Sequence, residues 1–127
     1  MPLHASGPGK VLLAHAPPEL LAAVLEGGLE RTASGTITDP DRLVRALADV
    51  RATGFCLSRD EMTDGASSVA APVCGPGGMV VAGLSVVVPS STGNLQPLVP
   101  AVRLTAAAVS RALGAPGRRS PLGGRKS

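Results

Sequence analysis

The first part of the chain carries apolar residues at helical spacing. Residues 9–14 predict a short helix, which must end before Pro17 because the residue preceding a proline is kept out of the helical region. Residues 19–25 predict a second helix, which Gly27 and Gly28 close.

The third helix has the clearest signals at both ends. Asp39 is a good N-cap, Pro40 suits the first helical position, and Gly54 is a stop signal. Between them the apolar positions repeat every three or four residues, at Leu43, Val44, Leu47 and Val50. We therefore expect a helix from residue 40 to the residue before Gly54.

The pattern then changes to short runs of β-branched and small apolar residues, separated by turn residues. Residues 55–59, 67–74 and 79–88 are predicted to be strands, and residues 75–78 (GPGG) join the last two as a tight antiparallel hairpin. If those four residues are the whole loop, Cys74 faces Met79 and Ser68 lies opposite Ser85.

Alternation along the last strand divides its side chains between two faces. Gly83, Ser85 and Val87 share one face, on which Gly83 and Ser85 form a hollow of small residues. The other face is apolar and comprises Val80, Ala82, Leu84, Val86 and Val88. One face is expected to pack in the core.

A final helix is predicted over residues 94–113, with Gly114 as its stop. Its apolar stripe comprises Leu95, Leu98, Val99, Val102, Ala106, Val109 and Leu113. Pro100 is interior to this range and predicts a kink or a later start. Helices, then an antiparallel sheet, then a packing helix predict one α+β domain over residues 1–114.

Composition narrows the classes of function. The chain has 127 residues and a net charge of +3, but residues 1–114 hold eight Lys/Arg against nine Asp/Glu. The basic excess lies in residues 115–127, which are predicted to be a disordered basic tail, solvated or in non-specific contact with nucleic acid. Phe55 is the only aromatic residue, so no stacking platform for bases is available.

Cysteine and histidine usage gives no metal site. Cys56 and Cys74 form no CxxC pair, and with His4 and His15 they do not make a zinc spacing, so no cofactor is expected. The start lacks a signal-peptide pattern, and the longest apolar run, residues 79–88, is too short to span a membrane. We expect a cytoplasmic protein.

Several segments together resemble one family. They are residues 2–10 (PLHASGPGK), 36–40 (TITDP), 53–55 (TGF) and 65–73 (GASSVAAPV), followed by the GLSV strand. In order and spacing they are similar to the effector-binding domain of IclR-type bacterial transcriptional regulators, over residues 2–114. The resemblance implies a GAF-like fold, present here in part, whose pocket binds a small organic acid or aromatic metabolite.

The resemblance also implies partners and site residues. An attached winged helix-turn-helix would contact DNA, and members are usually dimers or tetramers, so we expect a homo-oligomer. The family's DNA-binding domain and first strands have no counterpart in the chain, which begins within the effector domain. The effector-binding residues carried over are Gly7, Pro8, Ser58, Ser68, Ser85 and Val87.

Three of those positions depart from the family pattern. The family frequently has an acid where Ser58 stands, a cysteine where Ser68 stands and a serine where Val87 stands. The loop at Gly7 and Pro8 leads into a helix N-terminus, which offers backbone N–H groups to an anion. These departures bear on which ligand is bound.

Other polar residues are interpreted as structural. His4 is expected to be a hydrogen-bonded structural histidine, and Asp60, Glu61 and Asp64 to be solvated in a turn. Ser68 and Ser85 are either ligand contacts or a hydroxyl pair satisfying each other.

The leading hypothesis is an effector-binding module without catalysis, regulating transcription through DNA contacts supplied elsewhere. The alternative is a non-functional or mis-started fragment with a structural or oligomerisation role only. An enzyme with a serine nucleophile is disfavoured, because no adjacent base is evident.

Overall fold

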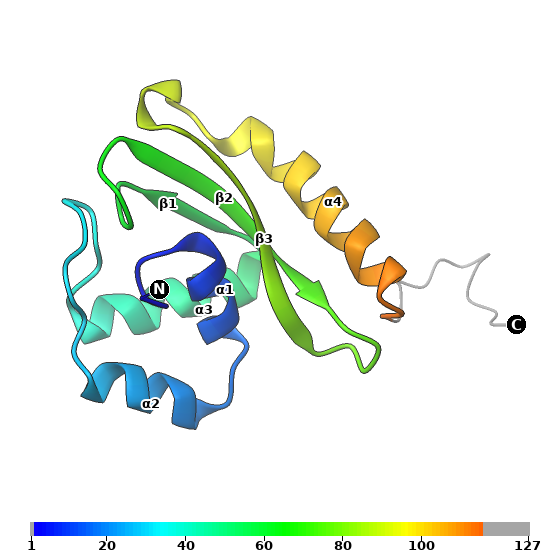
Figure 1. Ribbon diagram of the computed structural model, residues 1–127, viewed down its shortest axis with the longest axis horizontal. Helices are drawn as coiled ribbons and strands as arrows, with labels where there is room; N and C mark the ends of the chain where they lie inside the picture. Colours follow the sequence, from blue (N-terminus) through cyan, green and yellow to red (C-terminus); the bar gives the residue numbers. More distant parts are fainter. Residues whose placement is uncertain (1, 116–127) are drawn as a thin grey trace, which may run out of the picture.

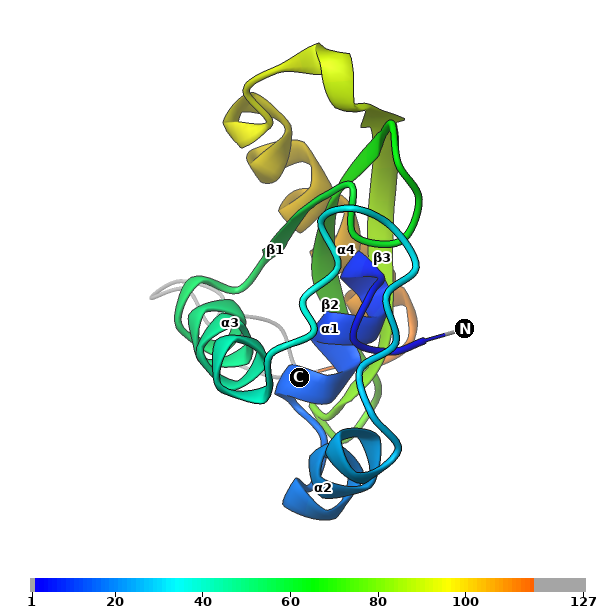
Figure 2. The same ribbon diagram turned by 90° about the vertical axis from the view of Figure 1, so that its left-hand side faces the viewer.

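The computed structural model describes residues 2–115. They form three layers, in which a small antiparallel sheet lies between helices (Figures 1 and 2). The strands are β1 (Cys56–Arg59), β2 (Ala66–Cys74) and β3 (Val80–Pro89), in the order β1-β2-β3. Helix α4 (Val99–Ala112) covers one face of the sheet, and α1 (Gly7–Ala14) and α3 (Pro40–Thr53) lie on the other. The predicted α+β class is confirmed. The predicted tail lies outside the described residues except for Ala115.

The helices of the first layer begin and end where their terminal residues predict. Ser6 caps α1 through its hydroxyl, and Gly54 closes α3 in the left-handed conformation. Asp39 is the N-cap of α3 but makes no side-chain capping bond. Helix α2 (Pro18–Glu26) lies at the periphery and has no fully buried residue, and it packs on the core through the partly buried Leu21, Val24 and Leu25.

The last helix begins later than the apolar stripe alone suggests. Residues Ser90–Thr92 and Gln96–Leu98 form short 3-10 helices, and α4 starts at Val99 with Pro100 in its first turn. A proline there avoids the lost hydrogen bond and the steric clash of an interior proline. The start at residue 94 is therefore wrong, whereas the later start that Pro100 predicts is confirmed. Val109 and Leu113 are substantially exposed rather than part of the core.

Two aliphatic clusters form the core, one on each face of the sheet. On the α4 face, Val69, Ala71 and Val73 of β2 pack against Leu95, Val99, Val102 and Ala106. On the other face, Val11 and Leu13 of α1 pack with Leu43, Leu47 and Val50 of α3 and with Cys56 and Ala70. Both faces of β2 are therefore largely covered, whereas several side chains of β3 remain exposed.

The β2–β3 hairpin differs from its predicted register by two residues. Cys74 pairs with Val80 and not with Met79, because the connecting loop holds five residues, and a β-bulge between Val73 and Cys74 adds one more on β3. Ser68 consequently lies opposite Val87, and Ser85 lies opposite Ala70. The bulge also moves Val80 away from the face of Ala82, and it packs on the α1 side instead.

Candidate functional site

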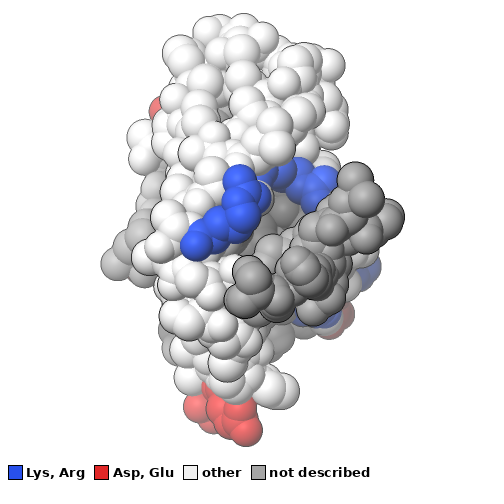
Figure 3. Space-filling model, turned by 90° about the vertical axis from the view of Figure 1, so that its right-hand side faces the viewer, with Lys and Arg blue, Asp and Glu red and all other residues white. Residues whose placement is uncertain are grey.

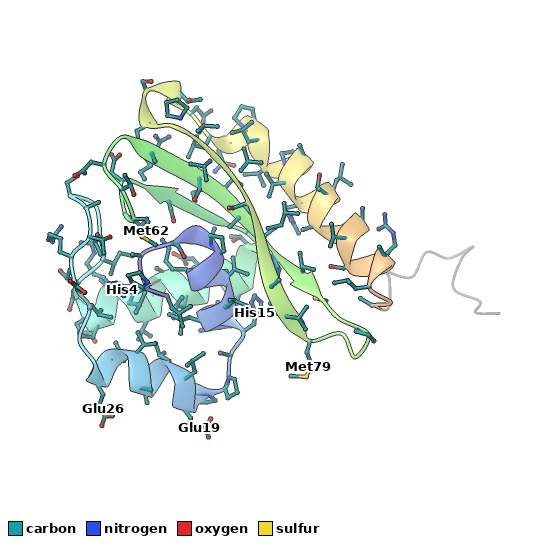
Figure 4. All side chains as sticks on the ribbon, in the orientation of Figure 1. His4, His15, Glu19, Glu26, Met62 and Met79 are labelled. Carbon is teal, nitrogen blue, oxygen red and sulfur yellow. The ribbon has the colours of Figure 1, made fainter. Side chains whose placement is uncertain are left out.

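One cavity of about 340 Å³ lies between the start of α1, the sheet and the loop after β1. Its lining includes all six residues proposed from the sequence, namely Gly7, Pro8, Ser58, Ser68, Ser85 and Val87. The loop contributes Glu61, Met62 and Thr63. Figure 4 shows Met62 beside α1, whereas Glu19 and Glu26 point outward from α2.

A row of side chains crosses the three strands at the floor of this cavity. Ser58 of β1 pairs with Ser68 of β2, which pairs with Val87 of β3. The predicted pairing of Ser68 with Ser85 is wrong, but the error of two residues preserves the alternation, and both serines still line the cavity. Ser58 and Ser68 are buried, while Val87 is 65% exposed at the rim.

The N-terminus of α1 approaches the sheet closely because its first residues are small. A Cβ on Gly7 would lie 2.8 Å from Ser68 Oγ, so a larger residue would fill the cavity here. The first turn offers fewer N–H groups than the sequence indicates. Pro8 has none, and the Gly9 N–H donates to Ser6 Oγ at 2.9 Å, which leaves the Gly7 N–H.

The small-residue hollow predicted at Gly83 and Ser85 is partly filled. A Cβ on Gly83 would come within 2.8 Å of Pro8 Cα and 3.1 Å of its carbonyl oxygen. Gly83 therefore serves the close packing of α1 on β3 and does not line the cavity, while Ser85 does. The prediction is correct for Ser85 and wrong for Gly83.

A buried ion pair lies beside the cavity and was missed by sequence reasoning. Lys10 Nζ donates to Glu61 Oε1 at 2.6 Å, with the lysine and glutamate side chains 3% and 11% exposed. The expectation that Glu61 is solvated is therefore wrong. One signal was available: Lys10 follows Gly7 by three residues and precedes Ala14 by four, so it lies on the buried face of α1 and requires a partner.

The loop before α3 fixes the position of Glu61. Thr36 and Thr32 donate from their hydroxyls to the Glu61 carbonyl at 2.5 and 2.8 Å. Gly35 packs directly on the backbone at the end of β1, since a Cβ on it would lie 2.5 Å from the Arg59 carbonyl oxygen. Ser90 Oγ and the Gly65 N–H both donate hydrogen bonds to Asp60 Oδ1 and fix the preceding residue. The carboxylate of Glu61 is thus attached to a rigid backbone.

Two further groups near α1, the Cys56 thiol and the His4 imidazole, are buried. Burial raises the pKa of the Cys56 thiol, and the positive charge of Lys10 and a hydrogen bond with Ser58 oppose this only in part. His4 is buried and hydrogen-bonds the Glu30 carbonyl at 2.7 Å, which confirms its predicted structural role.

A second hollow of about 300 Å³ lies between α4, β2 and the end of α3. Arg103 and Arg111 line it, and Figure 3 shows basic side chains beside a hollow on this side of the molecule. Ser110 Oγ accepts the Cys74 N–H at 2.9 Å, and Arg103 packs against Gly54. Ser110 thus joins α4 to β2, and Arg103 lies against the end of α3.

Across residues 2–115, no three His, Cys, Asp or Glu side chains converge as a metal site. Within the same range, no helix has the length and apolar character needed to cross a membrane.

Comparison with known proteins identifies the family. Residues 1–111 match the family model described as bacterial transcriptional regulator IclR C-terminal. The transcriptional repressor AllR of Klebsiella pneumoniae is 38% identical over 118 residues, which are 90% of this chain and 43% of that protein.

Solved structures agree in fold as well as in sequence. An IclR homolog from Microbacterium hydrocarbonoxydans, crystallised with 4-hydroxybenzoate, is 36% identical with a TM-score of 0.83, over 89% of this chain and 46% of its own. The inducer-binding domain of PobR from Acinetobacter, a double mutant in complex with 3-hydroxybenzoic acid, is 32% identical with a TM-score of 0.78, over 87% of this chain and 66% of its own.

The chain belongs to the IclR family of bacterial transcriptional regulators and comprises its C-terminal, GAF-like region. It spans less than half the length of the curated relatives that it matches.

Proposed function

We propose that this chain is an effector-binding module that holds a small organic acid or aromatic metabolite in the cavity between α1 and the sheet. The observation that carries the proposal is the convergence of Gly7, Pro8, Ser58, Ser68, Ser85 and Val87 on one cavity of about 340 Å³. That volume lies within the range of small-molecule sites, about 300–1,000 Å³. Hydroxyl groups on a wall that is apolar apart from Glu61 are suited to orienting a ligand.

The relatives support the choice of ligand class. Two solved neighbours are complexes with hydroxybenzoic acids. In this chain the Gly7 N–H and the hydroxyls of Ser58 and Ser68 are the donors for a carboxylate. The ligand is bound and released unchanged, without catalysis, since His4 is engaged with Glu30 and does not line the cavity.

Binding regulates transcription through DNA contacts made by a helix-turn-helix outside these residues, in a homo-oligomer. A ligand influences DNA affinity only if it binds one of two conformations more tightly. The direction of the response therefore depends on the state in which the cavity is better formed.

The test is urea unfolding of the purified chain, monitored by circular dichroism, with and without a panel of small organic acids. An acid at a hundred times its dissociation constant is expected to stabilise the chain by about 2.7 kcal/mol. Ser68→Ala is expected to weaken that acid several-fold, as for a neutral hydrogen bond. Ser91→Ala, at an exposed serine in a 3-10 helix, is the matched control and should bind normally.

Indifference to every acid would contradict the proposal. A broad, non-cooperative transition under the same conditions would instead favour a fragment with only a structural or oligomerisation role.

A further inference from the structure

The buried carboxylate of Glu61 gives the cavity a feature that its serines do not. We propose that Glu61 accepts a hydrogen bond from a hydroxyl group of the effector, so that the cavity selects hydroxy acids over the same acids without a free hydroxyl. This inference rests on the proposed function, because it names a specificity determinant of the same site.

The charge pattern of the lining is the first step. Among the described residues, Glu61 is the only charged side chain that lines the cavity. Serine and threonine hydroxyls either donate or accept, whereas an ionised carboxylate only accepts. Ser6 and Ser67 are already engaged, with the Gly9 N–H and with Ser90 Oγ. Glu61 is therefore the strongest acceptor available to a ligand.

The second step concerns which oxygen is available. Oε1 of Glu61 receives the Lys10 ammonium at 2.6 Å, and no described residue donates to Oε2. Every fully buried side-chain oxygen in the described part of the chain has a partner, so Oε2 retains accessible surface. Because Glu61 lines the cavity and is only 9% exposed overall, the cavity is the route by which a ligand would reach Oε2. A carboxylate oxygen so poorly hydrated gains from a donor supplied by a ligand.

The third step explains why an acid is tolerated beside a carboxylate. Lys10 compensates the charge of Glu61, so the pair as a whole does not expel an anion. The donors for the ligand's carboxylate, the Gly7 N–H and the serine hydroxyls, come from α1 and the strands, whereas Glu61 comes from the loop after β1. A ligand with a carboxylate at one end and a hydroxyl at the other satisfies both groups.

The fourth step is rigidity. The Glu61 backbone is held by Thr32 and Thr36, and Lys10 holds one of its carboxylate oxygens. When the ligand lacks a hydroxyl, a fixed carboxylate cannot move to find another donor, and its second oxygen remains without a hydrogen bond. Sites built to bond a substrate hydroxyl discriminate strongly for this reason.

The experiment compares matched acids by calorimetric titration of the full chain. The pairs are 4-hydroxybenzoate with 4-methoxybenzoate, 3-hydroxybenzoate with 3-methoxybenzoate, and lactate with propionate. Within at least one pair, the wild-type chain is expected to prefer the hydroxy acid by about tenfold or more. In Glu61→Gln that preference should fall to within about threefold, because a neutral amide is a weaker acceptor. Glu19→Gln makes the same change on the exposed surface of α2 and should leave it intact.

The ratio within a pair separates recognition from folding. A merely structural role for Glu61 would weaken both members equally and leave the ratio unchanged, which would overturn the inference. Because Glu61→Gln leaves Lys10 buried opposite a neutral group, the double variant Lys10→Met/Glu61→Met tests the same ratio with apolar packing retained. Its ratio should also fall, and an unchanged ratio there would count against the inference.

The two proposals fail in different ways. If acids bind but no pair shows a preference for the hydroxyl, the role of Glu61 is wrong and the proposed function stands. If no acid binds to the folded chain, both are wrong.

Discussion

The two faces of the sheet are built from alternate residues of the same strands, yet they differ in chemistry. The α4 face carries Val69, Ala71 and Val73 against an aliphatic helix and contains the larger fully buried side chains of β2. The α1 face carries Ser58, Ser68 and Ser85, a cavity, and a buried ion pair. Both faces also have an aliphatic cluster, so the difference lies in the buried serines and the ion pair of the α1 face, which favour binding at the expense of stability.

The largest expected effect comes from weakening the aliphatic face. Leu95 is 1% exposed within the α4 cluster, and Leu95→Ala is expected to lower the free energy of unfolding by about 2–5 kcal/mol. Urea unfolding measures this loss. Leu104→Ala, at a residue of α4 that is 71% exposed, is the control, with an expected change within about 0.5 kcal/mol. If the two faces are separable, Leu95→Ala at a temperature where it is folded retains the wild-type ranking of acids.

A smaller effect is expected from the contact that forms the cavity wall. Gly83→Ala places a methyl group 2.8 Å from Pro8 Cα, and backbone cannot give way as a flexible side chain does. We expect a loss of about 1–3 kcal/mol together with weaker acid binding, because the start of α1 is pushed from the sheet. Unfolding curves and titration measure the two quantities. Gly77→Ala, in open space at the hairpin tip, should change neither stability nor acid binding. Unaltered acid binding in Gly83→Ala would show that the position of α1 does not affect the binding site.

The smallest effect concerns pH. Burial raises the pKa of Cys56 in the folded chain, so the unfolded chain loses this proton first as pH rises. The contribution of the thiol to stability is thus complete below about pH 9 and declines above it. Between pH 8 and 10 the wild-type chain should lose more stability than Cys56→Ala, measured by urea unfolding at each pH. Parallel curves for the two chains would show that the thiol does not titrate differently on folding.

Local sequence patterns predicted most of the fold because residues at the ends of the helices and strands mark where they begin and stop. Asp39, Pro40 and Gly54 delimit α3, and the change from helical spacing to β-branched runs locates the strands. Alternation alone assigned Ser68 and Ser85 to one face, and this held although the register was displaced. A displacement of one residue would have reversed the assignment.

The charged part of the site was not recoverable from local pattern. Glu61 follows a residue with a positive φ, Asp60 at 52°, in a segment rich in acidic and turn residues that is typical of an exposed loop. Its burial depends on Lys10, Thr32 and Thr36, which lie 25 to 51 residues away along the chain. Such contacts follow from how α1 and the loop before α3 fold over β1, and no short-range signal encodes that arrangement.

The β-bulge at the start of β3 also bears on insertions and deletions. With the hairpin end fixed, one residue added between Ala82 and Leu84 would turn Ser85 toward α4 and bring Leu84 to the cavity in its place, exchanging the two faces beyond that point. The bulge already accommodates one additional residue at the hairpin end, where Met79 and Val81 are largely exposed. Changes in chain length are therefore least disruptive at the hairpin tip, and the segment that lines the cavity is constrained in length as well as in composition.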